Sequence, residues 1–121
     1  MKPLEWVGAS LKDLKEFPRP VQTRMGFALK LAQLGDKHPD AKPLKGFHGA
    51  GVLEIVDDDD GQTYRAVYTV KFVDTIYVLH AFQKKSTRGI ATSQRDVELI
   101  RARLQWAEEL YAKQKGRSDE R

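Results

Sequence analysis

Apolar residues in the N-terminal third of the chain recur at the spacing of helices. The first helix is predicted to begin at Ser10, because Leu11, Leu14 and Phe17 then lie on one face. Ser10 and Asp13 also have the spacing of a capping box, in which each side chain satisfies a backbone N–H at the helix start. We therefore expect Ser10 to cap this helix.

A second helix is predicted beyond Phe17–Pro20, whose two prolines interrupt the first. Its apolar positions are Val21, Met25, Ala28, Leu29 and Ala32. Gly35 is a favourable stop, because glycine readily adopts the left-handed conformation common after a helix. The two segments together predict an αα-hairpin from Ser10 to about Leu34.

Three β-rich runs in the middle of the chain predict an antiparallel meander. They are Val52–Val56, Thr63–Phe72 and Thr75–Gln83. Asp57–Gly61 separates the first two and ends in Asp-Gly, a strong hairpin signal, and Val73–Asp74 forms a tight turn between the last two. Pro3–Val7 is expected to be a short edge strand, whereas Gly35–Gly51, rich in proline and glycine, is expected to be a loop.

The last segment of the chain has the pattern of an amphipathic helix. Ser93 and Asp96 form a second capping box at its start. The apolar stripe consists of Val97, Ile100, Leu104, Ala107 and Tyr111. From Lys113 the sequence is polar, and we expect it to fray.

These elements follow the order β-α-α-β-β-β-α, which predicts an α+β fold. An antiparallel β-sheet meander carries an N-terminal helical hairpin and a C-terminal helix. At 121 residues the chain is long enough for one domain with its own core. We place a single domain at residues 1–112, followed by a polar tail at residues 113–121.

Composition narrows the class of protein. The absence of cysteine excludes disulfides and thiolate metal sites. No apolar run has the length of a membrane span, and the N-terminus lacks the apolar region of a signal peptide, so we expect a cytoplasmic protein that does not engage a membrane.

Charge points to an anionic partner. The formal net charge is +4, but four of the 17 acidic residues lie in Asp57–Asp60, which leaves 13 acidic against 21 basic residues elsewhere. Such a surface favours nucleic acid or an acidic peptide as partner, although an ordinary solvated surface explains the charge equally well.

Common catalytic and metal-binding patterns are missing. The aspartate block fails the calcium-loop pattern, since Val56 stands at the first ligand position, and a solvated hairpin tip explains it better. His38, His48 and His80 lack the spacing of a helical metal site. The chain also lacks nucleophile-elbow, phosphate-loop, dinucleotide and kinase motifs, and no cofactor is expected.

The basic residues of the meander form the candidate site. Arg65 begins one strand while Lys84 and Lys85 end the next, so antiparallel pairing brings them to the same end of the sheet. Alone, each is more often a solvated surface charge, but their convergence suits a phosphate. Further basic residues flank this set: Lys42, Lys45, Arg88 and Arg95.

Clustered cations are enough for RNA cleavage by the neighbouring 2′-hydroxyl, because they stabilise the charge that develops on the phosphate. Proton transfer then needs a group with a shifted pKa, and His80, Tyr64 and Tyr68 are the candidates. Strand alternation places both tyrosines on the face opposite Arg65. For His80, a hydrogen-bonded structural histidine is the competing interpretation.

Several short segments resemble the phage-derived HigB-like branch of the RelE/ParE toxin superfamily. They are Lys42–Gly46, Gly51–Glu54, Tyr64–Arg65 with Tyr68, Ile76–Lys85 and the final helix DVELIRARLQWAEELY. Each segment is weakly diagnostic, but their order and spacing make the combined resemblance specific over about residues 40–111. Relatives often have Thr-Pro before the last helix, and Ser93 stands in place of that proline.

The resemblance implies a ribosome-dependent mRNA endonuclease that inhibits translation as the toxin of a type II toxin–antitoxin system. It further implies neutralisation by a helix-turn-helix antitoxin, for which we expect an interface on the helical hairpin or last helix. Arg65, Lys84 and Lys85 would hold the scissile phosphate, and Lys42 and Lys45 would face RNA or the ribosome. The alternatives are a non-catalytic inhibitor of a protein such as DNA gyrase, and a basic nucleic-acid-binding module without toxicity.

Overall fold

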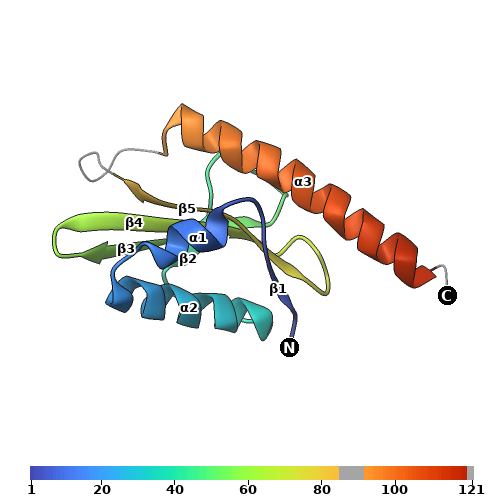
Figure 1. The fold of residues 1–121 in the computed structure, drawn as a ribbon, viewed down its shortest axis with the longest axis horizontal. Coiled ribbons are helices and arrows are strands. Elements are labelled where there is room, and N and C mark those ends of the chain that lie inside the picture. Colours follow the sequence, from blue (N-terminus) through green and yellow to red (C-terminus); the bar gives the residue numbers. More distant parts are fainter. Residues whose placement is uncertain (85–91, 120–121) are drawn as a thin grey trace.

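The computed structural model describes residues 1–84 and 92–119. A five-stranded sheet lies between helices α1 and α2 on one face and helix α3 on the other (Figure 1). The elements are β1 (Leu4–Trp6), α1 (Ser10–Lys15), α2 (Arg19–Gln33), β2 (Ala41–Pro43), β3 (Val52–Asp59), β4 (Gln62–Thr69), β5 (Ile76–Lys84) and α3 (Gln94–Asp119). This arrangement confirms the α+β fold.

The sheet has the strand order β1-β5-β4-β3-β2. Strands β3, β4 and β5 form the predicted antiparallel meander, and β1 is the predicted edge strand, paired in parallel with β5. The β3–β4 turn is the predicted hairpin, with Asp60 and Gly61 at φ 50° and 77°, as a two-residue turn requires. The sequence missed β2, whose three residues form the other edge of the sheet inside the expected loop.

The two predicted capping boxes have different outcomes. At α3 the Asp96 N–H donates to Ser93 Oγ at 3.2 Å, so Ser93 caps this helix as predicted. Only this half of the box is formed, because the Asp96 carboxylate accepts from the Ser93 hydroxyl. At α1 the prediction is wrong, because Ser10 is already helical and no side chain caps the helix. The Ser10 hydroxyl instead donates to the Val78 carbonyl of β5 at 3.1 Å, and so ties the helix to the sheet.

Helix α3 continues through the polar C-terminal segment. The sequence predicted fraying from Lys113, whereas the helix is continuous to Asp119. Its last turns extend beyond the sheet (Figure 1). Lys115 pairs with Asp74 at 3.1 Å and helps to fasten this part of the helix to the loop before β5. No helix in the described ranges is long and apolar enough to cross a membrane.

An irregularity in β5 decides which side chains face α3. Val67 of β4 pairs with His80, but the next residue, Tyr68, pairs with Val78, so Leu79 is an extra residue in β5. Leu79 therefore joins the core under α3, and His80 also points towards that helix. Because of the bulge, the neighbours Leu79 and His80 both face α3, whereas strict alternation would place one of them on the opposite face of the sheet.

Candidate functional site

A groove of about 690 Å³ lies between the start of α3, the β2 edge and the surface of β3 and β4. Among the described residues, four cationic side chains line it: Lys42, Lys45, Arg65 and Arg101. Three of these four were predicted from the sequence. The groove therefore gathers positive charge from β2, the segment after it, β4 and α3 into one concave surface.

Arg65 is held in a fixed orientation at the floor of this groove. Its Nη1 atom contacts Glu54 Oε2 of β3 at 2.9 Å and Thr92 Oγ1 at 3.2 Å. The side chains of Arg65 and Glu54 are only 13% and 11% exposed. Its Nε atom is buried and has no hydrogen-bond partner among the described residues. A guanidinium held in this way has donors left for an oxyanion.

Lys84 lies on the same face of the sheet as Arg65. The register pairs Arg65 with Phe82 and Thr63 with Lys84, so the two cations are diagonal neighbours at one end of the sheet. The Lys84 ammonium is buried without a hydrogen-bond partner in the part of the chain that the structure describes. Burial lowers the pKa of Lys84 and the charge of Arg65 lowers it further, while Glu54 and Asp96 oppose the shift.

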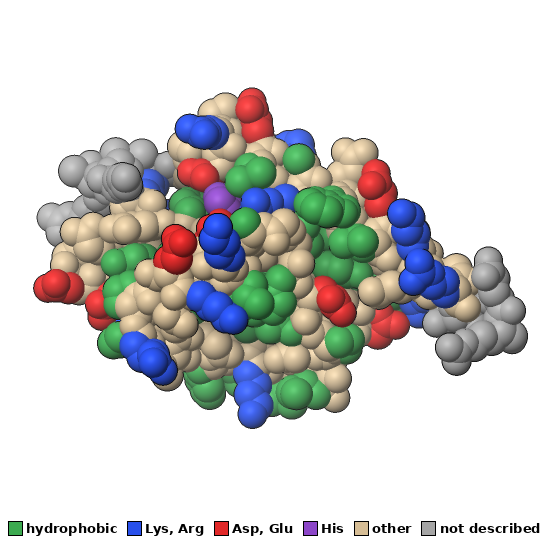
Figure 2. Space-filling model, viewed as in Figure 1, with side chains coloured by type: hydrophobic (Ala, Val, Ile, Leu, Met, Phe, Trp, Pro, Cys, Tyr) green, Lys and Arg blue, Asp and Glu red, His purple; other side chains and the backbone are tan. Residues whose placement is uncertain are grey.

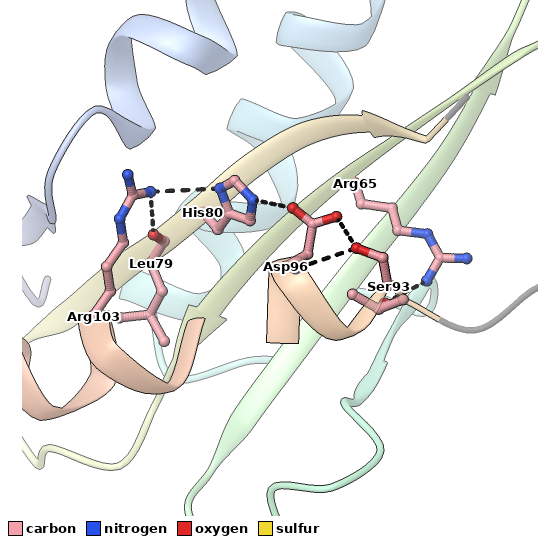
Figure 3. Close-up of polar contacts among 7 residues, drawn as sticks. Arg65, Leu79, His80, Ser93, Asp96 and Arg103 are labelled. Atoms are coloured by element: carbon pink, nitrogen blue, oxygen red, sulfur yellow. Dashed lines mark hydrogen bonds and ion pairs between the residues drawn. The ribbon is translucent and has the colours of Figure 1, made fainter. Parts of the chain in front are cut away.

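His80 lies between an acid and a base of α3. Its Nε2 atom is 2.8 Å from Asp96 Oδ1, and its Nδ1 atom is 3.4 Å from Nη1 of Arg103 (Figure 3). Because a guanidinium only donates, Nδ1 accepts and Nε2–H donates to Asp96, which is the neutral tautomer. Arg103 also donates to the Leu79 carbonyl at 2.9 Å. Both ring nitrogens of His80 are therefore engaged.

Burial lowers the pKa of His80, since its side chain is in a poorly solvated position and the residue is only 6% exposed. Asp96 opposes this shift and Arg103 supports it. Asp96 is itself positioned by Ser93, whose hydroxyl donates to Oδ2 at 2.7 Å. A series of hydrogen bonds therefore connects Ser93 at the start of α3, through Asp96, to His80 of β5. A proton-transfer role for His80 stays a prediction.

The two tyrosines lie on the opposite face, as strand alternation predicted. The ring of Tyr64 packs against Phe17 with centroids 4.9 Å apart, and Tyr68 is fully buried. Burial raises the pKa of Tyr68 to about 12. Neither phenol lines the groove, whereas His80 and Lys84, whose pKa values are shifted, lie on the α3 face of the sheet.

The remaining predicted residues are placed differently. Arg95 is exposed in the first turn of α3 and does not line the groove. Lys85 and Arg88 lie outside the described residues. Sequence reasoning missed Arg101, whose guanidinium lies 4.7 Å from the centre of the Phe47 ring. The sequence did indicate where Arg101 would lie, because it follows Val97 by four residues and residues i and i+4 share a helix face.

The sequence also missed Glu54 as the partner of Arg65. The two residues are 11 apart in sequence and lie on adjacent strands, with Arg65 paired to Val56. Both side chains project to the α3 face because Glu54 and Val56 are two residues apart in β3. The pairing of Glu54 with Arg65 could therefore have been predicted from the register of the β3–β4 hairpin.

With this geometry described, comparison with known proteins identifies the family. Residues 12–105 match the family described as phage-derived protein Gp49-like (DUF891), a RelE-like toxin family. The chain belongs to the Gp49-like family. No match to this Gp49-like protein was found among curated proteins.

The fold of this Gp49-like protein is similar to that of a bacterial toxin. It matches the crystal structure of the isolated E. coli RelE toxin with a TM-score of 0.57 and 18% sequence identity. The match covers 73% of the present chain and 89% of the RelE chain. Family and fold together support a phage-derived toxin of the RelE superfamily, as the sequence resemblance predicted.

Proposed function

We propose that this Gp49-like protein is the toxin of a type II toxin–antitoxin system and cleaves mRNA on the ribosome. The observation that carries the proposal is the fixed guanidinium of Arg65 at the floor of the cationic groove. Lys42, Lys45 and Arg101 line the same groove and offer further charges to a polyanionic strand.

In the proposed reaction the 2′-hydroxyl of the RNA attacks the adjacent phosphorus. A bond from the 2′-oxygen to phosphorus forms, the bond from phosphorus to the 5′-oxygen breaks, and a cyclic phosphate remains. One proton leaves the 2′-hydroxyl and one is delivered to the 5′-oxygen. Arg65 stabilises the negative charge on the phosphate, because its donors are already oriented in a poorly solvated site.

Lys84 is the second phosphate-binding group of the proposal, together with Lys85. The ammonium of Lys84 is buried beside Arg65 without a partner among the described residues, so an incoming phosphate oxygen would supply the missing contact. His80 is proposed to serve in proton transfer from its position next to Asp96. Arg88 and Arg95 are also proposed to contact RNA.

The proposed partner in the cell is a helix-turn-helix antitoxin encoded beside this protein, which would neutralise it. An antitoxin can act by covering the groove or by binding elsewhere on the toxin. Co-expression distinguishes a neutralised toxin from a harmless protein, since growth arrest should disappear when the neighbouring gene is expressed with it.

The activity is tested by replacing Arg65. Induced expression of wild type should arrest translation and create new mRNA 5′ ends, and Arg65→Ala should reduce cleavage by about 100-fold, since a preorganised donor to the developing charge is lost. Arg65→Lys should restore only part of the activity, because the forked donor geometry is missing. Lys30→Ala on α2 is the control and should cleave like wild type.

Circular dichroism and thermal unfolding establish that each variant is folded. Arrest with intact mRNA and impaired DNA supercoiling would replace the nuclease proposal by the gyrase alternative. Full cleavage by folded Arg65→Ala would contradict the role assigned to the groove.

A further inference from the structure

The outer edge of β3 is open beyond its short pairing with β2. β2 pairs with Leu53–Ile55, which leaves Val56–Asp59 without a paired strand on that side among the described residues, although His38 and Asp40 lie close by. The N–H of Leu44 donates to the carbonyl of Val52, so alternate residues of β3 direct their backbone groups to this edge. Val56 and Asp58 thus direct their backbone N–H and C=O groups to this edge, where β2 pairs with neither of them.

A pocket of about 370 Å³ adjoins this open edge on the α2 face. Its surface is mainly apolar, with Met25, Phe27, Ile55 and Val56 as the apolar lining residues. The polar and charged lining residues are Thr23, Arg24, His38, Asp40 and Asp57. The Phe27 ring is held edge-on against the ring of His38 with centroids 5.9 Å apart, although Phe27 is 58% exposed. Since side chains alternate along a strand, a strand added to this edge would direct one of them into the pocket.

The charge around the edge is the reverse of that in the groove. Asp57 and Asp59 share Arg24, at 2.7 Å and 3.2 Å, whereas Asp58 and Asp60 are exposed. Acidic side chains gather at the end of the molecule where the β3–β4 turn lies, at the left of Figures 1 and 2. This edge repels nucleic acid and complements lysine or arginine.

We propose that the β3 edge binds an extended basic segment of another polypeptide as an added antiparallel strand. Val56 and Asp58 would supply the backbone hydrogen bonds, the exposed aspartates would face its lysines or arginines, and Phe27 would cover one apolar side chain in the pocket. The site is independent of RNA cleavage, because the cationic groove lies on the α3 face of the same sheet.

The test uses a synthetic heptapeptide, acetylated and amidated, in which lysine alternates with leucine. Titration into isotope-labelled protein should shift the backbone amide signals of Val56 and Asp58 in NMR spectra. Phe27→Ala and the double change Asp58→Lys with Asp60→Lys should each weaken binding by about tenfold, as expected for an anchor or a charged rim. Glu109→Lys on α3 is the control for a single charge reversal away from the edge and should bind like wild type.

Two altered peptides test the mode of binding. Proline in place of the central leucine removes a backbone N–H, and glutamate in place of lysine reverses the charge, so both should bind weakly. Signal shifts confined to α3 would overturn the proposal. So would Phe27→Ala and double-lysine variants that bind the peptide as tightly as wild type. Self-association in sedimentation that Phe27→Ala abolishes would assign the edge to a second copy of the chain and overturn it as well.

Discussion

The imidazole of His80 lies between the carboxylate of Asp96 and the guanidinium of Arg103, both from α3. Asp96 alone would favour the charged imidazolium, but burial and Arg103 favour the neutral ring, and their combined effect lowers the pKa. A proton added to His80 would have to displace Arg103 from Nδ1. The neutral ring is therefore part of the packing between β5 and α3.

Acidification is expected to weaken the fold through His80. In the unfolded chain the histidine pKa is near 6.5, and in the folded protein it is lower. Between these two values the unfolded state binds more protons, so the free energy of unfolding falls as pH falls below 6.5, by at most about 1.4 kcal/mol per pH unit. Urea denaturation between about pH 7.5 and 5.5 measures this slope.

His80→Gln is the control for that slope, because glutamine retains a donor for Asp96 but does not titrate. In this variant the free energy of unfolding should no longer fall just below pH 6.5, and only the decrease at the lower pH values where carboxylates titrate should remain. An identical slope in wild type and His80→Gln would show that another group is responsible.

For single residues, the sequence predicted which side chains lie together better than it predicted what surrounds each of them. Antiparallel pairing of β4 with β5 brought Arg65 and Lys84 to one end of the sheet as predicted. The tight turn predicted at Val73–Asp74 is wrong, because residues 70–75 connect these two strands. The surroundings of His80 depend on the bulge at Leu79 and on where α3 docks. Both are tertiary features that no local pattern encodes.

Among the elements, the two helix starts show how tertiary contacts compete with local signals. Ser10 and Ser93 both precede an aspartate by three residues, yet only Ser93 caps its helix. The hydroxyl of Ser10 is buried against β5, where the Val78 carbonyl accepts its hydrogen bond. The β2 strand was missed because three residues ending in Pro43 carry too little alternation to be distinguished from a loop.

Removal of the α3 cap should have a measurable cost. Ser93→Ala leaves the Asp96 N–H without its acceptor and frees the carboxylate that contacts His80, so we expect a loss of about 1 kcal/mol in the free energy of unfolding. Thr23→Ala is a matched control, since its hydroxyl donates to the Arg19 carbonyl on an exposed helix face. The control should change stability by less than about 0.5 kcal/mol, and equal losses in chemical denaturation would contradict the capping role.

For the whole molecule, charge is divided between distinct surfaces. The groove beside α3 is cationic, whereas the end of the β3–β4 hairpin is acidic. The α+β class and the meander were predictable, because hydrophobic periodicity and turn residues agree along most of the chain. The groove was only partly predictable, since Arg101 and Glu54 enter it through helix docking and strand register.

RNA binding should depend steeply on salt if the groove is its site. Four cations along a single strand predict that the logarithm of the binding constant falls with the logarithm of salt concentration with a slope of about −3. Lys42→Ala should reduce the steepness by about 0.7, whereas Lys30→Ala on the far face should leave it unchanged. Fluorescence anisotropy with a labelled RNA measures the slope for wild type and for each variant. Equal slopes for wild type, Lys42→Ala and Lys30→Ala would show that RNA binds outside the groove.

The parallel pairing of β1 with β5 has a consequence for synthesis of the chain. Leu4 pairs with Ile76, so the first strand finds its place only after most of the polypeptide has been made. Arg101 belongs to α3, which is made after all five strands and closes the cationic groove. A nascent chain therefore emerges with its first strand unpaired until β5 has been made and with its groove incomplete until α3 has been made.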